Sequence, residues 1–580
     1  MPPQGNQQGQ PSILQQTKKI VIEKFNGGLV DNWWYTQVAG LINRDDIFQD
    51  DPTKLAFGYS NVLIKDGVLY PELDTPTDVN QINQLNSNKR VIGFVSVPDT
   101  YVDSSNKRTI FFVQDTKFHA FKLNGFKIMS TSDTPNDFPI GLSGGYITAP
   151  HNAHSGHTFQ DIALYQINGQ PAVFMPFYDN TDADLICYYV NAHTMLTSDK
   201  FYGALLPDGS SNHSVLDKNF PTFLVPSDNT KMYIFNGQSC HSFNGNASKG
   251  VNGEVELEVF QIGDEKMFVD ACEWNGMMYI AAKASSLSDP SLTTNLPNQR
   301  IEIYIWDRNA GSANDSIIID ASDIYNLFSD GNRVYAWIKG SGLRTELWVY
   351  GLMPDEKGVP HVRFNNTFTK VKTVGYSGNG IPANRRSITR YKDGIIWQDI
   401  YGKVYYFDSK NNALHILATT GQNVLGNSGA LINYNGQALM FNRYSSGAER
   451  VSVIPLEGSA DTSSVGNGGS NVGGVEFGWF ELPKFSTLVG CTVYWKPKSS
   501  VGKTANSVNF YFTFKDTAPN ELNRVIQTSD WNAGFKWFQL GKSYVNKYKF
   551  YVSFDTNATY SDLIEIYKIE FDYIPGTKRG

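Results

Sequence analysis

Short runs of β-branched and aromatic residues, in which apolar and polar positions alternate, recur along most of the chain after residue 90. The run Val-Tyr-Ala-Trp-Ile at 334–338 is one example. Alternation with a period of two places successive side chains on opposite faces of a β-strand. No stretch of 15 residues has the i, i+3, i+4, i+7 spacing of an amphipathic helix. The pattern therefore predicts an all-β fold.

Turn signals separate these runs at intervals that suggest a repeat. Asn-Gly and Asp-Gly pairs favour two-residue hairpin turns, because both residues tolerate positive φ. The pairs are Asn124-Gly125, Asn168-Gly169, Asn236-Gly237, Asn275-Gly276, Asp330-Gly331, Asp393-Gly394 and Asn435-Gly436. Successive pairs are 39 to 68 residues apart. The shorter intervals match one four-stranded propeller blade, and the longer ones leave room for loop insertions.

The segment 385–419 contains four short strand-like runs joined by tight connections, which is the content of one blade. We therefore expect a β-propeller of six or seven blades over residues 91–456. Residues 20–90 are expected to form an N-terminal β segment that leads into the propeller or closes it. A pair of β-sandwiches would show the same hairpin turns, but turns spread over more than 300 residues favour radial repetition.

Composition marks the remaining boundaries. Residues 1–19 are rich in Gln, Pro and Gly and are expected to form a flexible arm. A Gly/Ser/Asn tract at 457–474 predicts a linker, and the strand-like runs of 475–580 predict a C-terminal β-sandwich. No apolar core of a secretory signal opens the chain, and no run of about 20 apolar residues could span a bilayer. We expect assembly in a cytoplasm and no membrane segment.

Charge and cysteine content exclude several function classes. The 56 acidic and 49 basic residues give a net charge of −7, with no basic stripe that could neutralise phosphates. Specific nucleic-acid binding is therefore not expected. The four cysteines, Cys187, Cys240, Cys272 and Cys491, stand singly with no CxxC pair, and we interpret them as isolated core thiols.

The spacing most typical of a metal site is the triplet His151, His154 and His157. Imidazole is a common metal ligand, and Asp161 is a carboxylate nearby. The triplet lies in a Gly/Ser/Asn stretch with no helix to place the rings on one face. Loop histidines that make hydrogen bonds or stack are the favoured interpretation.

Other chemical signatures are missing or ambiguous. A Gly-x-Ser-x-Gly elbow, a P-loop and a helix-opening Gly-x-Gly-x-x-Gly are absent, so neither an enzyme nor a cofactor is expected. The aromatic group Trp33, Trp34 and Tyr35 is a candidate partner contact or sugar platform, since such residues dominate interface hot spots. An ordinary place in the core is an equal alternative.

One segment near the start resembles a known family. Its landmarks are Phe25-Asn26-Gly27-Gly28-Leu29, Asp51-Pro52 with Leu55, Gly58, Asn61-Val62 and Asp66-Gly67 followed by Leu69. This order of motifs is similar to the start of the β-propeller virion proteins of tailed bacteriophages. The chain departs from that pattern in its long Trp-rich stretch before Asp51 and in its Gln-rich arm.

The resemblance implies a non-enzymatic structural protein of the virion, in the tail or the neck, such as a nozzle. It implies a homo-oligomeric ring that contacts other tail or neck proteins and forms part of the conduit for DNA ejection. DNA would pass through such an assembly without specific binding. The alternative is a carbohydrate-binding or glycan-cleaving propeller that acts on a cell-surface polysaccharide, including a phage protein that recognises a host-surface glycan.

Overall fold

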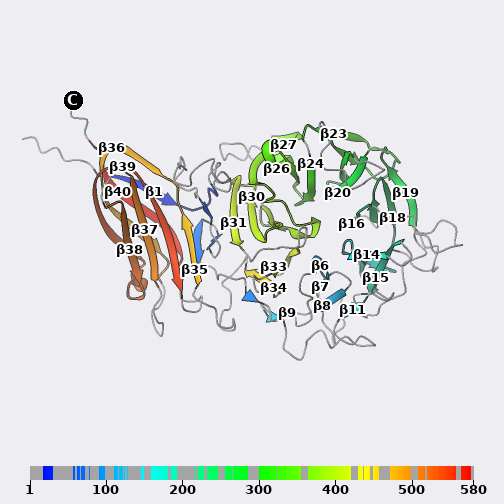
Figure 1. Ribbon diagram of the computed structural model, residues 1–580, viewed down its shortest axis with the longest axis horizontal. Helices are drawn as coiled ribbons and strands as arrows, with labels where there is room; N and C mark the ends of the chain where they lie inside the picture. Colours follow the sequence, from blue (N-terminus) through cyan, green and yellow to red (C-terminus); the bar gives the residue numbers. More distant parts are fainter. Residues whose placement is uncertain are drawn as a thin grey trace, which may run out of the picture.

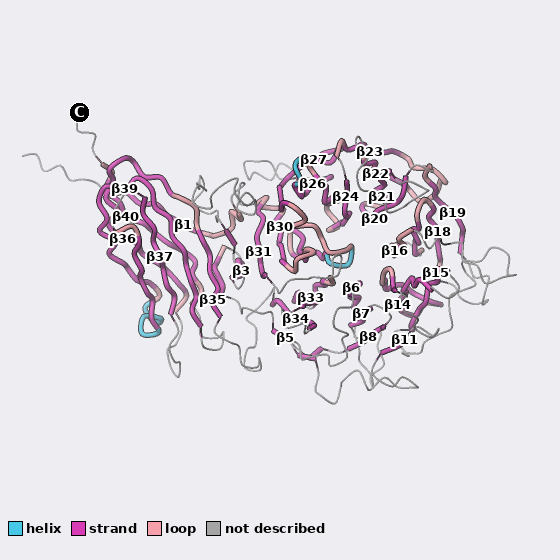
Figure 2. The backbone as a smooth tube through the Cα atoms, in the orientation of Figure 1, coloured by secondary structure: helices cyan, strands magenta, loops and turns pink. Residues whose placement is uncertain are grey.

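In a computed structural model, most of the residues that the structure describes lie in β-strands, which form two joined bodies (Figures 1 and 2). The structure describes residues 17–29, 57–58, 62–65, 67–71, 77–78, 91–97, 110–114, 117–121, 123–124, 127–128, 146–148, 158–179, 184–191, 216, 220–227, 231–245, 255–263, 266–284, 300–321, 323–353, 363–419, 429–434, 437–443, 449–455, 471–497, 507–515, 519–556 and 564–576. The all-β prediction is confirmed.

Seven four-stranded sheets of the described residues are arranged around a ring and form the blades of a propeller (Figure 1). In chain order, the first three blades are β6 (Val91–Ser96), β7 (Ile110–Gln114), β8 (Lys117–Phe121) and β11 (Tyr146–Thr148); β12 (Thr158–Phe159), β13 (Ala163–Ile167), β14 (Gln170–Asp179) and β15 (Asp184–Asn191); and β16 (Thr222–Pro226), β17 (Met232–Asn236), β18 (Ser239–Phe243) and β19 (Val255–Gln261). In blade 2, β12 and β13 both pair with β14.

Four more blades follow: three are made of consecutive antiparallel strands, and the last combines three consecutive strands with a strand from the N-terminal part of the chain. They are β20 (Lys266–Trp274), β21 (Met277–Ala284), β22 (Ile301–Trp306) and β23 (Asp315–Ile319); β24 (Asp323–Ser329), β25 (Arg333–Lys339), β26 (Arg344–Met353) and β27 (Arg363–Tyr376); β28 (Ile388–Tyr391), β29 (Gly394–Gln398), β30 (Lys403–Asp408) and β31 (Ala413–Thr419); and β32 (Leu431–Tyr434), β33 (Gln437–Arg443) and β34 (Glu449–Pro455) with β5 (Thr77–Asp78). Strand β5 completes blade 7 by pairing Asp78 with Ser452.

Small elements lie outside the blade sheets. The described residues include a two-stranded sheet of β9 (Leu123–Asn124) and β10 (Lys127–Ile128), and the 3₁₀ helices η7 (Ser341–Leu343), η8 (Arg385–Ser387) and η10 (Thr528–Ala533). Of these, η8 immediately precedes the inner strand of blade 6 and positions the candidate site.

Several hairpin turns fall where the sequence predicts them, and others are shifted. The pairs Asn168-Gly169 and Asn275-Gly276 have positive φ at both residues and join consecutive strands. In blade 6, however, Tyr391 pairs with Gly394, so the turn is Lys392-Asp393 and the predicted Asp393-Gly394 turn is wrong by one residue. A Cβ on Gly394 would lie 1.9 Å from the carbonyl oxygen of Phe407, so glycine serves strand packing there.

Two further predicted turns are also shifted by one residue. Asn124 pairs with Lys127 and Asn236 pairs with Ser239, so each asparagine is the last residue of its strand; in blade 3 the turn then begins at Gly237.

The second body is a β-sandwich that combines both ends of the chain. Its strands are β1 (Lys18–Glu23), β2 (Phe57–Gly58), β3 (Val62–Lys65), β4 (Val68–Pro71), β35 (Asn471–Glu476), β36 (Phe480–Trp495), β37 (Ser507–Lys515), β38 (Glu521–Gln527), β39 (Phe535–Thr556) and β40 (Ile566–Ile574). The first part of β39 pairs with β36, and its last part pairs with β37. This long strand therefore belongs to both layers, whose inner faces meet where the rings of Phe512 and Phe571 lie 6.2 Å apart.

These strands change the expected boundaries. Strand β1 begins at Lys18, inside the expected 1–19 arm, and pairs with β40. Within 20–90, β1 to β4 join the sandwich sheet, and β5 closes the propeller. Strand β35 begins at Asn471, inside the expected 457–474 linker. The reason is burial: Ile22 and Leu69 are fully buried in the core that the sandwich shares with the propeller.

The segment Phe25 to Leu29 joins the two bodies. The backbone N–H of Leu29 donates to the carbonyl of Leu414 in β31 at 2.7 Å, and the ring of Phe25 lies 6.0 Å from that of Phe477 next to β35. Gly28 has φ +71°, and a Cβ there would lie 2.7 Å from the backbone nitrogen of Leu414. One hydrophobic cluster therefore runs from blades 5 and 6 through this segment into the sandwich.

Candidate functional site at the propeller axis

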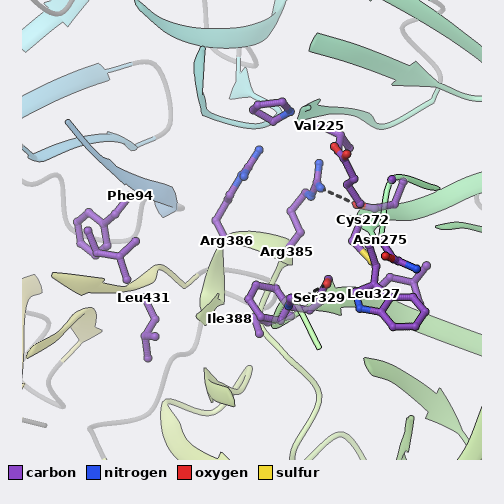
Figure 3. A pocket seen from close by; sticks show the side chains of 18 residues that line it. Phe94, Val225, Cys272, Asn275, Leu327, Ser329, Arg385, Arg386, Ile388 and Leu431 are labelled. Carbon is purple, nitrogen blue, oxygen red and sulfur yellow. Dashed lines mark hydrogen bonds between the residues drawn. The ribbon is translucent and has the colours of Figure 1, made fainter. Parts of the chain in front are cut away.

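Two consecutive arginines extend from blade 6 toward the propeller axis. Arg385 and Arg386 lie in η8, whose N-cap residue is Asn384. The side chain of Asn384 accepts a hydrogen bond from the backbone N–H of Arg386 at 2.8 Å and donates one to the carbonyl of Gly429 at 2.6 Å. This short capped turn holds both guanidinium groups side by side at the cavity (Figure 3).

Asp161 is the main acceptor for these cations. Its carboxylate is 1% exposed and accepts from Nε of Arg386 at 2.8 Å and Nη2 at 3.0 Å. Arg385 approaches the same carboxylate at 3.4 Å. Asp161 also accepts the backbone N–H groups of Ile162 in its own blade and of Leu224 in blade 3, each at 2.8 Å. One carboxylate thus links blades 2, 3 and 6.

Asp270 repeats this arrangement two blades further on. It accepts the backbone N–H of Ala271 at 2.8 Å and that of Leu327 in blade 5 at 2.9 Å, and it pairs with Nε of Arg385 at 3.2 Å. Arg385 also donates to the carbonyl oxygens of Leu224 at 2.6 Å and Ala271 at 3.0 Å. We call Arg385, Arg386, Asp161 and Asp270 the axial cluster; it connects blades 2 to 6.

The axial cluster is neutral and its acidic oxygens are engaged. Burial alone would raise the pKa of Asp161, but Arg386 and Arg385 hold that pKa below its usual value. The pKa of Asp270 is raised by burial, which the single nearby arginine only partly offsets. The guanidinium of Arg385 also lies 4.8 Å from the ring centroid of Phe223. Hydrogen-bonded charge pairs of this kind hold elements in place, and removing one partner leaves a costly buried charge.

Beside the axial cluster lies a cavity of about 610 Å³ (Figure 3). Inner strands and neighbouring loops of several blades line it, and among the lining residues that the structure describes Glu273 is the one carboxylate. Glu273 is paired with Arg308 at 2.9 Å. Burial raises the pKa of the Cys272 thiol well above its ordinary value. The described lining therefore offers neither the carboxylate pair of a glycosidase nor an activated thiol nucleophile.

The sequence candidates fall differently on the structure. Trp33, Trp34 and Tyr35, and the triplet His151, His154 and His157, lie outside the described residues. Asp161, considered as a partner for that triplet, belongs to the axial cluster. The described residues hold no group of three or more His, Cys, Asp or Glu suited to a metal ion.

Cysteines Cys240, Cys272 and Cys491 are buried free thiols, as expected. Within the described part of the chain no helix is long and apolar enough to cross a membrane.

Sequence reasoning missed the axial cluster. Arg385 and Arg386 are 224 and 225 residues from Asp161 in the chain, and Arg385 is 115 residues from Asp270 (385 − 270), so no local motif joins them. The available signal was the adjacent pair Arg385-Arg386 at the start of a blade, in a chain with only 18% charged residues.

No family model and no curated protein matches the chain. Among solved structures, the RRP9 WD40 repeats match at 8% identity and a TM-score of 0.38, over 67% of this chain and 100% of that one. The Dos1 propeller matches at 10% identity and 0.36, over 69% and 88%. An exo-beta-1,3-galactanase from Phanerochaete chrysosporium matches at 8% identity and 0.25, over 64% and 99%. Similarities this weak say nothing about function. The propeller is defined by the seven sheets of this chain and by the pairing of β5 with β34 that completes blade 7.

Proposed function

We propose that this protein is a non-enzymatic structural component of the virion of a tailed bacteriophage, in the tail or neck, where it forms part of the DNA-ejection conduit. The observation that carries the proposal is the place of the segment that resembles such proteins. Its described residues form the joint between propeller and sandwich, at Phe25, Gly28 and Gly67.

The joint makes the two bodies one continuous unit, which suits a part that bears load. The backbone N–H of Phe25 donates to the carbonyl of Gly67 at 2.8 Å. Gly67 has φ +77°, and a Cβ there would lie 2.6 Å from the Cβ of Lys24. Phe25 is thus tied to the β3–β4 hairpin of the sandwich, while Gly28 and Leu29 contact Leu414 of blade 6, so this short segment is anchored in both bodies.

The axial cluster bears on where a conduit would run. Arg385 and Arg386 bond across the propeller axis to other blades, and the cavity beside them is about 610 Å³. A duplex could not pass through this propeller, so the conduit would lie between copies arranged in a ring. The net charge of −7 fits this arrangement, because an acidic wall does not hold passing phosphates.

Two experiments test the proposal. An epitope-tagged copy of the gene is expressed during phage propagation, and gradient-purified particles are examined by peptide mass spectrometry and immunogold labelling. Label at the tail or neck is the expected result. Purified protein is also examined by negative-stain microscopy and light scattering across concentrations, where rings are expected. A protein that stays monomeric and is absent from particles would contradict the proposal.

A further inference from the structure

The outward face of the sandwich layer β39-β36-β40-β1 carries an unusual set of side chains. These strands lie in the sandwich body (Figure 1), and their register aligns three rows of residues across the layer. The rows are Phe535, Tyr494, Lys568 and Glu23; Trp537, Thr492, Glu570 and Val21; and Gln539, Gly490, Asp572 and Lys19. Aromatic rings occupy the β39 side, and charged groups occupy the β40 and β1 side.

The aromatic residues are exposed and close together. Phe535 is 57% exposed, Trp537 is 49% exposed and Tyr567 is 40% exposed. The ring of Tyr494 lies 6.2 Å from that of Phe535 and 6.3 Å from that of Tyr567. Three neighbouring rings therefore form a row across the strands, with Trp537 beside it. We call Phe535, Trp537, Tyr494 and Tyr567 the aromatic row.

Trp537 is held against the sheet. A Cβ on Gly490 would lie 2.5, 2.6 and 2.7 Å from Nε1, Cε2 and Cζ2 of the indole. The indole thus occupies the space that a side chain at position 490 would need, and about half of Trp537 remains exposed. A ring already fixed in this way loses little conformational entropy when something stacks on it.

The charged side is a network of ion pairs whose outer members remain accessible, with the side chain of Lys19 54% exposed and that of Glu23 62% exposed. The carboxylate of Glu570 accepts from Lys19 at 2.9 Å and from the hydroxyl of Tyr494 at 3.1 Å, and it pairs with Lys568 at 2.8 Å. Lys568 also pairs with Glu23 at 2.8 Å. Although burial opposes the charged form, these partners lower the pKa of Glu570 to about 2. With Asp572 near Lys19 at 3.8 Å, three acidic and two basic groups lie together.

We propose that the aromatic row and its charged border form a binding site for a neutral saccharide chain. The negative faces of aromatic rings attract the C–H groups of a sugar, and the bordering lysines and carboxylates offer hydrogen bonds to its hydroxyls. An apolar protein face would take water from this charged network without replacing the lost hydrogen bonds, whereas the hydroxyls of a sugar can replace the displaced water as hydrogen-bond partners. An acidic glycan would meet Glu23 and Asp572 at the border. This inference does not depend on the virion role.

The test uses the purified full-length protein and hexasaccharide probes. Isothermal titration calorimetry is run with cellohexaose, chitohexaose, laminarihexaose, maltohexaose and mannohexaose, and with the acidic probe hexagalacturonate. We expect at least one neutral probe to bind and hexagalacturonate to bind at least about tenfold more weakly. Trp537→Ala and Phe535→Ala should each weaken the neutral interaction about tenfold, as expected of aromatic anchors.

The matched control is Tyr511→Ala, which removes a ring that is 42% exposed on β37, outside this layer. It should leave affinity within about twofold of the parent. Gly490→Ala keeps every aromatic side chain but displaces the Trp537 indole from the sheet. It should weaken binding, because the sugar is expected to stack on the indole in its present orientation. Circular dichroism of each variant identifies any that fails to fold, and the remaining variants then decide.

The proposal is overturned if no neutral probe binds, or if Trp537→Ala and Phe535→Ala bind like the parent. It is also overturned if Trp537→Ala abolishes a concentration-dependent dimer while no sugar binds, since the face would then contact a second copy. Failure of this test leaves the protein's presence in particles unaffected, so the two proposals are separately testable.

Discussion

Replacing Asp161 with Asn tests whether the axial cluster holds the propeller together. The change preserves shape and removes one charge from a carboxylate that is 1% exposed. The amide oxygen can still accept the N–H of Leu224, but the amide group cannot neutralise Arg386. The side chain of Arg386 is 19% exposed, so its charge would stay largely buried without its main partner.

Removing one partner of a buried ion pair costs about 3 to 5 kcal/mol, because the other charge is left uncompensated. The unfolding entropy is about 2.1 cal/mol/K per residue, which gives about 0.8 kcal/mol/K for a propeller that spans residues 91–456. The expected fall in the melting temperature is therefore about 4 to 6 °C.

Differential scanning calorimetry and urea unfolding measure the change. The matched control is Glu256→Gln, which breaks the exposed pair with Lys231 in blade 3; Glu256 is 62% exposed. Exposed pairs contribute less than about 1 kcal/mol, so this control should shift the melting temperature by about 1 °C. A double variant with Arg386→Met should cost less than the sum of the two single changes. If Asp161→Asn melts within about 1 °C of Glu256→Gln, the axial cluster does not hold the blades and the reasoning is refuted.

Three other changes probe the joint, the acid response and a buried turn. Gly28→Ala should lower the free energy of unfolding by about 2 to 5 kcal/mol and make the joint susceptible to limited proteolysis. Gly169 has a similar φ but no atom within 4 Å of the position of an added Cβ, so Gly169→Ala should lower the free energy of unfolding by about 1 kcal/mol. Burial lowers the pKa of both His241 and His415 from 6.5 to about 4. Between pH 6.5 and 4 the unfolded chain therefore binds more protons than the folded chain, so the unfolding free energy should be constant above pH 6.5 and fall toward pH 4. The fall should be less steep in His415→Phe. Urea unfolding at a series of pH values measures it, and equal dependence of the unfolding free energy on pH in the parent and the variant would contradict this. Tyr335→Phe should lower the free energy of unfolding by about 1.5 to 3 kcal/mol in the same assay, because the hydroxyl of Tyr335 donates to the buried carboxylate of Asp330 at 2.7 Å. An unchanged urea midpoint would show that this hydrogen bond does not stabilise the fold.

Local features of the fold were readable from the sequence because they depend on neighbouring residues. The Asn168-Gly169 and Asn275-Gly276 turns need positive φ at two adjacent positions, which their own chemistry allows. The four strands of blade 6 come from consecutive short runs within 385–419. The shifted turn at Lys392-Asp393 shows the limit, because Gly394 is required by the carbonyl of Phe407 on another strand.

Local sequence patterns were sufficient to predict the strand class, the hairpin repeat and a second β body, since each follows from the period of two and from turn chemistry. The three-dimensional arrangement was needed to see that β1 to β4 join the sandwich, that β5 closes blade 7, and that Arg385 and Arg386 bond to Asp161 and Asp270 across the axis. These contacts join residues that are far apart along the chain. A hydrogen bond or ion pair between residues more than 100 positions apart depends on how blades and layers are placed, and no local pattern of polar and apolar residues records that placement.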